Sequence, residues 1–276
     1  MAEKKSEKIK TKTVKKSTKK NADVATERKK AKSEGDKATA KRLLLAERKP
    51  IDFFYVAGQS TDKKLEYIEI QQVLNDKFNG KILQRQFFPV AESSERIITL
   101  NRLLIDRAVY DATVNAKIRF LVQVSAKWFS TPAKINEFVN FVAKMGEYVV
   151  LCFDSVTLVK AGQVAKDVLE QLKKERFTKI LLDNVEFQNL GLLIGYHPDY
   201  IRLDARLIDK TDEKYVLVLR FMRDYCKAQS VRLCVRNVKD DAMKNWLLLN
   251  GVNVVEGNCV YTPKKNVSTI REHYKL

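Results

Sequence analysis

The sequence has few of the residues on which most metal and nucleophilic sites depend. His197 and His273 are its only histidines, and its four cysteines show no Cys-x-x-Cys spacing. Zinc sites and Ser–His–Asp triads need such residues, so both classes of site are disfavoured. Three of the cysteines lie in apolar runs, a pattern typical of reduced, buried thiols rather than of a disulfide framework. We therefore expect no metal and no other cofactor.

Long apolar runs are absent as well. No stretch approaches the ~18–20 consecutive apolar residues of a membrane span, and the N-terminus lacks the apolar core of a secretion signal. P-loop, G-x-G-x-x-G, H-E-x-x-H and G-x-S-x-G motifs are also missing. These absences predict a cytoplasmic protein that does not contact membranes.

Charge is distributed unevenly along the 276 residues. Residues 1–50 hold 18 Lys and Arg against 7 Asp and Glu, a net charge of +11, which leaves +7 of the total +18 for the remainder. From Ala2 to Ala40 there are almost no large apolar side chains, so this part cannot bury enough surface to offset its ordering entropy. We expect a disordered, Lys-rich basic arm over residues 1–48 and a folded domain over residues 49–276.

Lysine clusters in the arm resemble segments that bind polyanions by counterion release. The candidate contacts are Lys15, Lys16, Lys19 and Lys20. The clusters are not interleaved with aromatic residues that would stack on bases, so sequence-specific recognition of nucleic acid is not expected. Two interpretations stay open, namely contact with nucleic acid or another polyanion, and an arm that only keeps the protein in solution.

From Ile51 onward, short apolar runs rich in β-branched residues alternate with helical patterns. Eight strands are predicted, at Ile51–Val56, Tyr67–Val73, Ile118–Val124, Tyr148–Phe153, Lys179–Asp183, Tyr200–Asp204, Val231–Val235 and Val252–Val255. Five helices are predicted, at Ile97–Val114, Pro132–Met145, Gly162–Glu175, Asp212–Ala228 and Asp240–Asn250. This alternation predicts an α/β protein with a closed, TIM-like (β/α)8 barrel. Only Ala57 to Glu66 joins the first two strands, too short for a crossover helix, so the first strand should be antiparallel.

The segment from Gly80 to Ala112 reads "GKILQRQFFPVAESSERIITLNRLLIDRAVYDA". It resembles the early part of the EAL family, bacterial signalling phosphodiesterases that hydrolyse cyclic di-GMP. In that family a Glu-Ala-Leu triplet is followed at fixed spacing by a glycine and by "FIP-x-AE". Here Glu69-Ile70-Gln71 takes the triplet's place, with Gly80 eleven residues beyond Glu69 and the "FFPVAE" segment eighteen beyond it. The resemblance covers about residues 51–262 and implies the EAL type of barrel, which also has an antiparallel first strand.

The same resemblance identifies where the family's catalytic groups would lie. EAL phosphodiesterases hold two divalent cations at the carboxyl ends of their strands, chiefly through carboxylates, and the cations activate a water. The triplet and the "VNLS", "EITES" and Asp-Asp motifs correspond to Glu69, Gln123, Leu151 with Asp154, and Asp183 with Asn184. The "KID", "AEGVE" and terminal "QG" motifs correspond to Arg202 with Asp204, Arg236 with Lys239, and Glu256.

Several of these replacements reverse the charge that a metal ion requires. Arg236 and Lys239 stand where the family has glutamates, and Leu151 stands where it has a metal ligand. Two unit charges ~4 Å apart interact by several kcal/mol at an effective dielectric constant near 20. We therefore expect a buried carboxylate–guanidinium network in this degenerate site. A catalytically inactive EAL-like domain that works as a regulatory or protein-interaction module, with an unknown protein partner, is the resulting prediction.

A second interpretation stays open, a cyclic di-GMP receptor or weak cyclic di-GMP phosphodiesterase. Guanidinium groups suit phosphate, so Arg202 and Arg236 are the candidate phosphate contacts. Val73 replaces an arginine that holds a ligand phosphate in the family, which argues against binding. The sequence therefore favours pairing of both arginines with Glu69, Asp183 and Glu256 over contact with the nucleotide.

Overall fold

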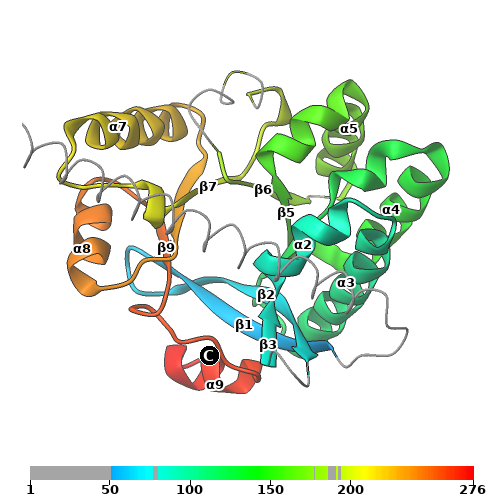
Figure 1. Cartoon of the computed structure of the whole chain (residues 1–276), viewed down its shortest axis with the longest axis horizontal. Helices are drawn as coiled ribbons and strands as arrows, with labels where there is room; N and C mark the ends of the chain where they lie inside the picture. The colour runs from blue at the N-terminus through cyan, green and yellow to red at the C-terminus, as the bar shows by residue number, and fades with distance from the viewer. Residues whose placement is uncertain (1–50, 77–79, 177, 186–190, 192–193) are drawn as a thin grey trace, which may run out of the picture.

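The barrel begins where the sequence changes from charged residues to β-branched and aromatic ones. The computed structural model describes residues 51–76, 80–176, 178–185, 191 and 194–276 (Figure 1). The predicted basic arm over residues 1–48, with its four candidate lysines, lies outside the described residues.

Eight strands close into a ring, and a ninth pairs outside it. The strands are β1 (Ile51–Ser60), β2 (Leu65–Asp76), β3 (Gly80–Leu83), β4 (Phe120–Val124), β5 (Val149–Asp154), β6 (Lys179–Asp183), β7 (Tyr200–Asp204), β8 (Arg232–Arg236) and β9 (Val254–Glu256). β1 is antiparallel to both β2 and β9, while β2 and β4 through β9 are parallel. The predicted (β/α)8 barrel with an antiparallel first strand is confirmed. β3, which pairs antiparallel with Val73–Asp76 of β2, beyond the residues of β2 that pair with β4, was not predicted.

Helices surround the barrel, most of them on the connections between its strands and one after the last strand (Figure 1). They are α2 (Gln84–Glu92), α3 (Arg96–Val114), α4 (Pro132–Met145), α5 (Ser155–Arg176), α7 (Glu213–Ala228), α8 (Asp241–Leu249) and α9 (Val267–Tyr274). The five predicted helices are found. α5 starts before the predicted Gly162, where a φ of 66° bends the chain between two helical segments. None of the described helices is long and apolar enough to cross a membrane.

Alternation along the strands produces two cores. Outward residues such as Val149, Leu151 and Phe153 of β5 pack with the helices in the larger core. Inward residues fill the barrel itself, and they are Tyr67, Leu121, Val150, Cys152, Leu181, Tyr200, Cys234 and Val254. The barrel is therefore a packed interior rather than a pore, and its next inward layer, at the carboxyl ends of the strands, is the one that carries charge.

Candidate functional site

Arg202 is the centre of the charged layer. It follows the buried Tyr200 by two residues on β7, so both side chains point into the barrel. Its guanidinium contacts three carboxylates, with Nε and Nη2 donating to Asp183 at 3.1 and 3.0 Å, Nη1 to Glu256 at 3.1 Å and Nη2 to Glu69 at 3.2 Å. Its exposed fraction is 0%. The carboxylate–guanidinium network expected from the sequence is present.

The pKa values of this network reflect burial opposed by charge. Burial alone would lower the pKa of Arg202, but Asp183, Glu256 and Glu69 raise it well above its usual value. Burial would raise the pKa of Asp183, yet Arg202 and Arg236 bring it below its usual value. Burial raises the pKa of Glu256, and Glu69 adds to this effect against the opposing charge of Arg202. Asp183 is therefore more firmly ionised than Glu256, which takes up a proton more readily.

Two further contacts fix the carboxylates. The Tyr67 hydroxyl donates to Glu256 from the layer below, and Gln71 donates to Glu69 at 2.9 Å from the same strand. The Tyr67 ring meets Tyr200 edge to face, with centroids 5.8 Å apart. Tyr67 was not identified from the sequence, because an aromatic residue within an apolar strand is usually part of the core.

Arg236 forms a second, more exposed centre beside the first. It donates to Asp183 through Nη1 and to the Asn184 side chain through Nη2, both at 2.7 Å. Its Nε lies 3.5 Å from Asp204, which also receives the Arg206 guanidinium. Although burial opposes the change, hydrogen bonds from Arg206 lower the pKa of Asp204. The parallel register that pairs Asp183 with Arg202 and Asp204 with Arg236 brings these charges together.

The other predicted positions divide between the site and its surroundings. Gln123 accepts a hydrogen bond from Gln84 at 2.9 Å and lines the mouth of the barrel. Asp154 accepts one from Asn184 at 2.8 Å and caps the start of α5. Lys239 is exposed and lines a neighbouring pocket instead.

Leu151 does not lie in the site. It faces the outer core, and Cys152 points inward in its place, with its sulfur 3.5 Å from Nη2 of Arg202. A displacement of one residue moves a strand side chain to the opposite face, so the resemblance-based assignment of Leu151 falls on the wrong side of β5.

The donor set does not fit a pair of divalent cations. Glu69, Asp183 and Glu256 carry the oxygens that a hard cation would require, but all three already accept hydrogen bonds from Arg202. A cation among them would lie against a buried guanidinium of like charge. Among the residues that the structure describes, no three His, Cys, Asp or Glu side chains are grouped to hold a metal ion.

A polar cleft of about 320 Å³ opens above this network. Gln71, Gln123 and Asn258 line it together with Arg85 and Arg236. The Arg236 side chain is 23% exposed, whereas that of Arg202 is 0% exposed. Of the two predicted phosphate contacts, only Arg236 is therefore accessible to a ligand in the cleft.

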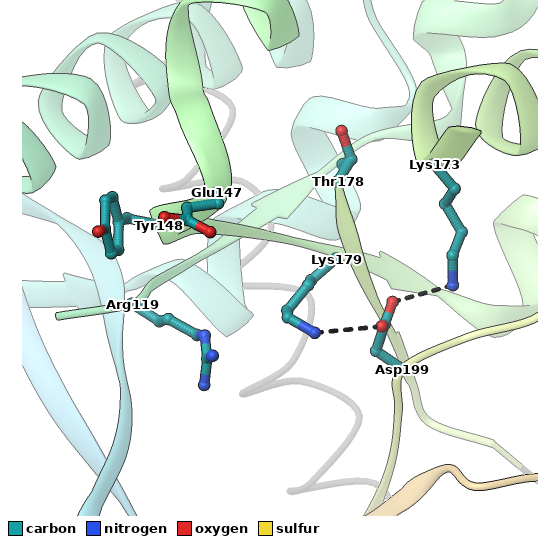
Figure 2. Close-up of a pocket in the computed structure, with 7 residues that line it drawn as sticks. All are labelled: Arg119, Glu147, Tyr148, Lys173, Thr178, Lys179 and Asp199. Carbon is teal, nitrogen blue, oxygen red and sulfur yellow. Dashed lines mark hydrogen bonds and ion pairs between the residues drawn. The ribbon is translucent and has the colours of Figure 1, made fainter. Parts of the chain in front are cut away.

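A second cavity, of about 530 Å³, lies at the amino ends of the parallel strands. Figure 2 shows Lys173 and Lys179 pointing toward Asp199, with Nζ–carboxylate distances of 3.0 and 3.4 Å. Asp199 also accepts a hydrogen bond from the backbone N–H of Ile180 at 3.0 Å. Both lysines thus pair with Asp199 of the barrel itself, which indicates a structural role for this end of the molecule.

Sequence comparison relates this chain to a known protein family. A family model described as EAL domain matches residues 45–263. The biofilm architecture maintenance protein MbaA of Vibrio cholerae is 20% identical over 195 residues, which are 67% of this chain and 24% of that protein. The chain therefore spans about a quarter of the length of the curated relative it matches.

Solved structures give the same fold. The EAL enzyme Bd1971, bound to cAMP and cyclic di-GMP, superposes with a TM-score of 0.73 at 15% identity over 89% of this chain and 70% of that one. The EAL domain of FimX from Pseudomonas aeruginosa, bound to cyclic di-GMP, gives a TM-score of 0.69 at 12% identity over 78% of this chain and 91% of that one. At such identities the likeness concerns the fold.

Proposed function

Because this chain belongs to the EAL domain family and a guanidinium lies among its site carboxylates, we propose that it is a catalytically inactive EAL-like domain. It acts as a regulatory or protein-interaction module. The observation that carries this proposal is the position of Arg202, buried within 3.2 Å of oxygens from Glu69, Asp183 and Glu256.

The energetics of the network support loss of hydrolysis. A buried ion pair persists because removing either partner leaves an uncompensated charge, at a cost of about 3–5 kcal/mol. A metal ion would have to displace Arg202 from three carboxylates at once. Arg236 adds a second positive charge 2.7 Å from Asp183. Hydrolysis in this family depends on two cations, and fold does not carry function without its site.

The test is calorimetric titration of cyclic di-GMP into the full chain, with and without Mg²⁺ or Mn²⁺, followed by assay of the mixture for linear product. We expect no product under any condition. Metal-dependent product would overturn the proposal. The matched comparison is Arg202→Lys, which keeps the charge but loses the two-point contact with Asp183.

A cyclic di-GMP receptor is the second candidate, and the exposed part of Arg236 in the polar cleft favours it. FimX binds the nucleotide on the same fold. Micromolar heat without product would support a receptor, and Arg236→Ala should then abolish most of that heat. Lys160→Ala on α5, at an exposed residue that does not line the cleft, is the matched control and should leave the heat unchanged.

The basic arm over residues 1–48 is proposed to contact nucleic acid or another polyanion. Its net positive charge supports this, since binding by counterion release depends on such lysines. Binding of a DNA duplex should weaken steeply with salt and disappear on deletion of residues 1–48. Binding that survives the deletion would assign the contact to the barrel.

A further inference from the structure

Helix α3 carries a row of exposed apolar side chains. Leu103, Tyr110 and Val114, called here the α3 row, are 44%, 58% and 58% exposed. Their spacing of seven and then four residues places them on one face of the helix. The solvent face of a helix on a globular protein is normally polar, so the α3 row is apolar surface that another segment can cover.

Arg107 joins this row to the first strand of the barrel. Its guanidinium carbon lies 5.4 Å from the centroid of the Tyr110 ring, 5.6 Å from that of Phe53 and 5.8 Å from that of Tyr55. Its Nε also donates a hydrogen bond to the buried Asp111 at 2.9 Å. The outward-facing aromatic residues of β1 therefore lie beside the α3 row, on the other side of one arginine.

The chain enters the barrel at this same edge. Phe53 is the third residue of β1, and Ile51, the first, packs against the outer core from the same face of the strand. A chain spans up to ~3.3–3.6 Å per residue. The residues that directly precede Ile51 are therefore within reach of the α3 row.

Those preceding residues are also the apolar part of the arm. Residues 41–50 read "KRLLLAERKP", and Leu43, Leu44 and Leu45 form the largest group of apolar side chains among the first fifty residues. The match to the EAL domain begins at residue 45, ahead of β1. By composition and by sequence match, this short segment differs from the Lys-rich residues before it.

Connectivity, rather than charge, selects the occupant of the α3 row. Arg107 pairs with Asp111 beside the row, and Asp106 is an exposed acid on the same helix, so neither sign of charge dominates. A segment joined directly to β1 meets the row at an effective concentration on the order of millimolar. A second copy or another protein has to bind at its own, lower concentration.

We propose that residues 41–50 fold back from β1 and pack Leu43, Leu44 and Leu45 on the α3 row. Apolar side chains of the arm then remove an apolar surface of the barrel from water. The basic residues before position 41 leave the barrel beside α3, so the arm is attached to this side of the molecule. This inference goes beyond the functions proposed above, because it concerns how the arm and the barrel are joined.

The experiment uses the full chain with Leu44 replaced by the photoreactive amino acid p-benzoylphenylalanine. After irradiation, peptide mass spectrometry identifies the residues that are joined to position 44. We expect a cross-link within Arg96–Val114 of the same chain. Leu103→Ser with Tyr110→Ser should reduce the yield of this cross-link at least about fivefold, because loss of one leucine-sized apolar contact shifts a docking equilibrium about tenfold.

Two controls accompany this measurement. Val156→Ser with Val164→Ser on α5 removes similar surface, since these residues are 41% and 48% exposed, and should leave the yield unchanged. The same photoreactive residue in place of Val24, in the Lys-rich part of the arm, should show no preference for α3. Circular dichroism checks that each variant is folded.

A cross-link to another part of the barrel, the absence of any cross-link, or an equal loss in the α5 variant would overturn the proposal. Cross-links between two chains, identified by doubled mass and by an increase with protein concentration, would assign the α3 row to a second copy and likewise contradict it. The readout involves neither cyclic di-GMP nor DNA. The tests of the proposed functions can therefore fail without deciding this one.

Discussion

Arg202 and Asp183 meet through two parallel contacts, Nε to Oδ1 at 3.1 Å and Nη2 to Oδ2 at 3.0 Å, with neither side chain exposed to solvent. Such two-point, charge-assisted contacts are stronger and more specific than single hydrogen bonds between neutral groups. Glu69 and Glu256 contact the same guanidinium, and among the described residues only Asp183 of the three carboxylates has a second cation, Arg236 at 2.7 Å. The stability of the barrel mouth therefore depends strongly on Arg202.

Arg202→Ala should therefore lower the free energy of unfolding by about 3–5 kcal/mol, because it leaves buried carboxylates without their counter-ion. Urea unfolding followed by circular dichroism measures the change. Arg202→Lys keeps the positive charge without the two-point contact, so it should lower the free energy of unfolding less than Arg202→Ala. It also allows the effect to be measured if the alanine variant fails to fold.

The matched control for that series is Lys174→Ala on α5. Its ion pair with Glu170 is exposed, with 73% and 55% of the two side chains accessible. Exposed pairs contribute about 0–1 kcal/mol, so this variant should stay near the wild type. A loss below about 1 kcal/mol for Arg202→Ala would show that the network is not a source of stability.

Asp183 and Asp204 should make the protein sensitive to acid. Their folded pKa values lie below the usual value, so they contribute stability that is fully present above the unfolded pKa of about 3.9 and lost as pH falls through the folded pKa. Glu256, with a raised pKa, acts in the opposite sense. The urea concentration at the midpoint of unfolding, measured between about pH 2.5 and 7, should decrease toward acidic pH.

The Asp183→Asn variant isolates the contribution of Asp183. The stability of this variant should decrease less steeply toward acidic pH than that of the wild type, because one group with a lowered pKa has been removed. Asp106→Asn, at an exposed carboxylate on α3, is the comparison. An unchanged acid limb in Asp183→Asn would assign the acid sensitivity to other carboxylates.

Glu256 and Asp183 should differ in how well they tolerate neutralisation. The pKa of Glu256 is raised by burial and by Glu69, while that of Asp183 is lowered by the two arginines despite its burial. Glu256→Gln should therefore cost less than Asp183→Asn, by at least about 1 kcal/mol of unfolding free energy. Equal losses, or the reverse order, would contradict this assignment of charge within the network.

The barrel could be predicted from the sequence because its strands are apolar, β-branched and separated by helical periodicity. The unpredicted β3 is four residues long, and Ile82 is its only buried residue. So short a segment gives no alternating pattern. The early start of α5 was not predicted, because Gly162 interrupts the helical pattern. The interruption suggested the beginning of a helix rather than a bend within one.

The site was only partly predictable for a different reason. Opposite charges at Glu69, Asp183 and Arg202 made their pairing foreseeable. Leu151 and Cys152 could not be told apart, because a one-residue ambiguity in a motif decides which face of a strand a side chain occupies. Lys239 lies in the loop after β8, and the position of a loop residue cannot be predicted from sequence periodicity.

At the mouth of the barrel, Gly257 should be the glycine whose substitution destabilises the fold most. Its φ is +152°, and a Cβ added there would lie 2.0 Å from the backbone oxygen of Val238. Main-chain atoms cannot rotate away, and Val238 N is tied to Glu256 O by a hydrogen bond of 2.9 Å. Gly257→Ala should therefore lower the unfolding free energy by about 3 kcal/mol, the upper range for overpacking.

Chemical denaturation measures this loss, and Gly191→Ala is the matched control, since a Cβ added there meets nothing within 4 Å among the described residues. The strain should also reach the network, because Gly257 directly follows Glu256. Near-wild-type stability of Gly257→Ala would mean that the segment from Glu256 onward shifts freely. Such a shift would let Glu256 move toward solvent once Arg202 is removed, so the Arg202→Ala loss should be smaller in the Gly257→Ala background.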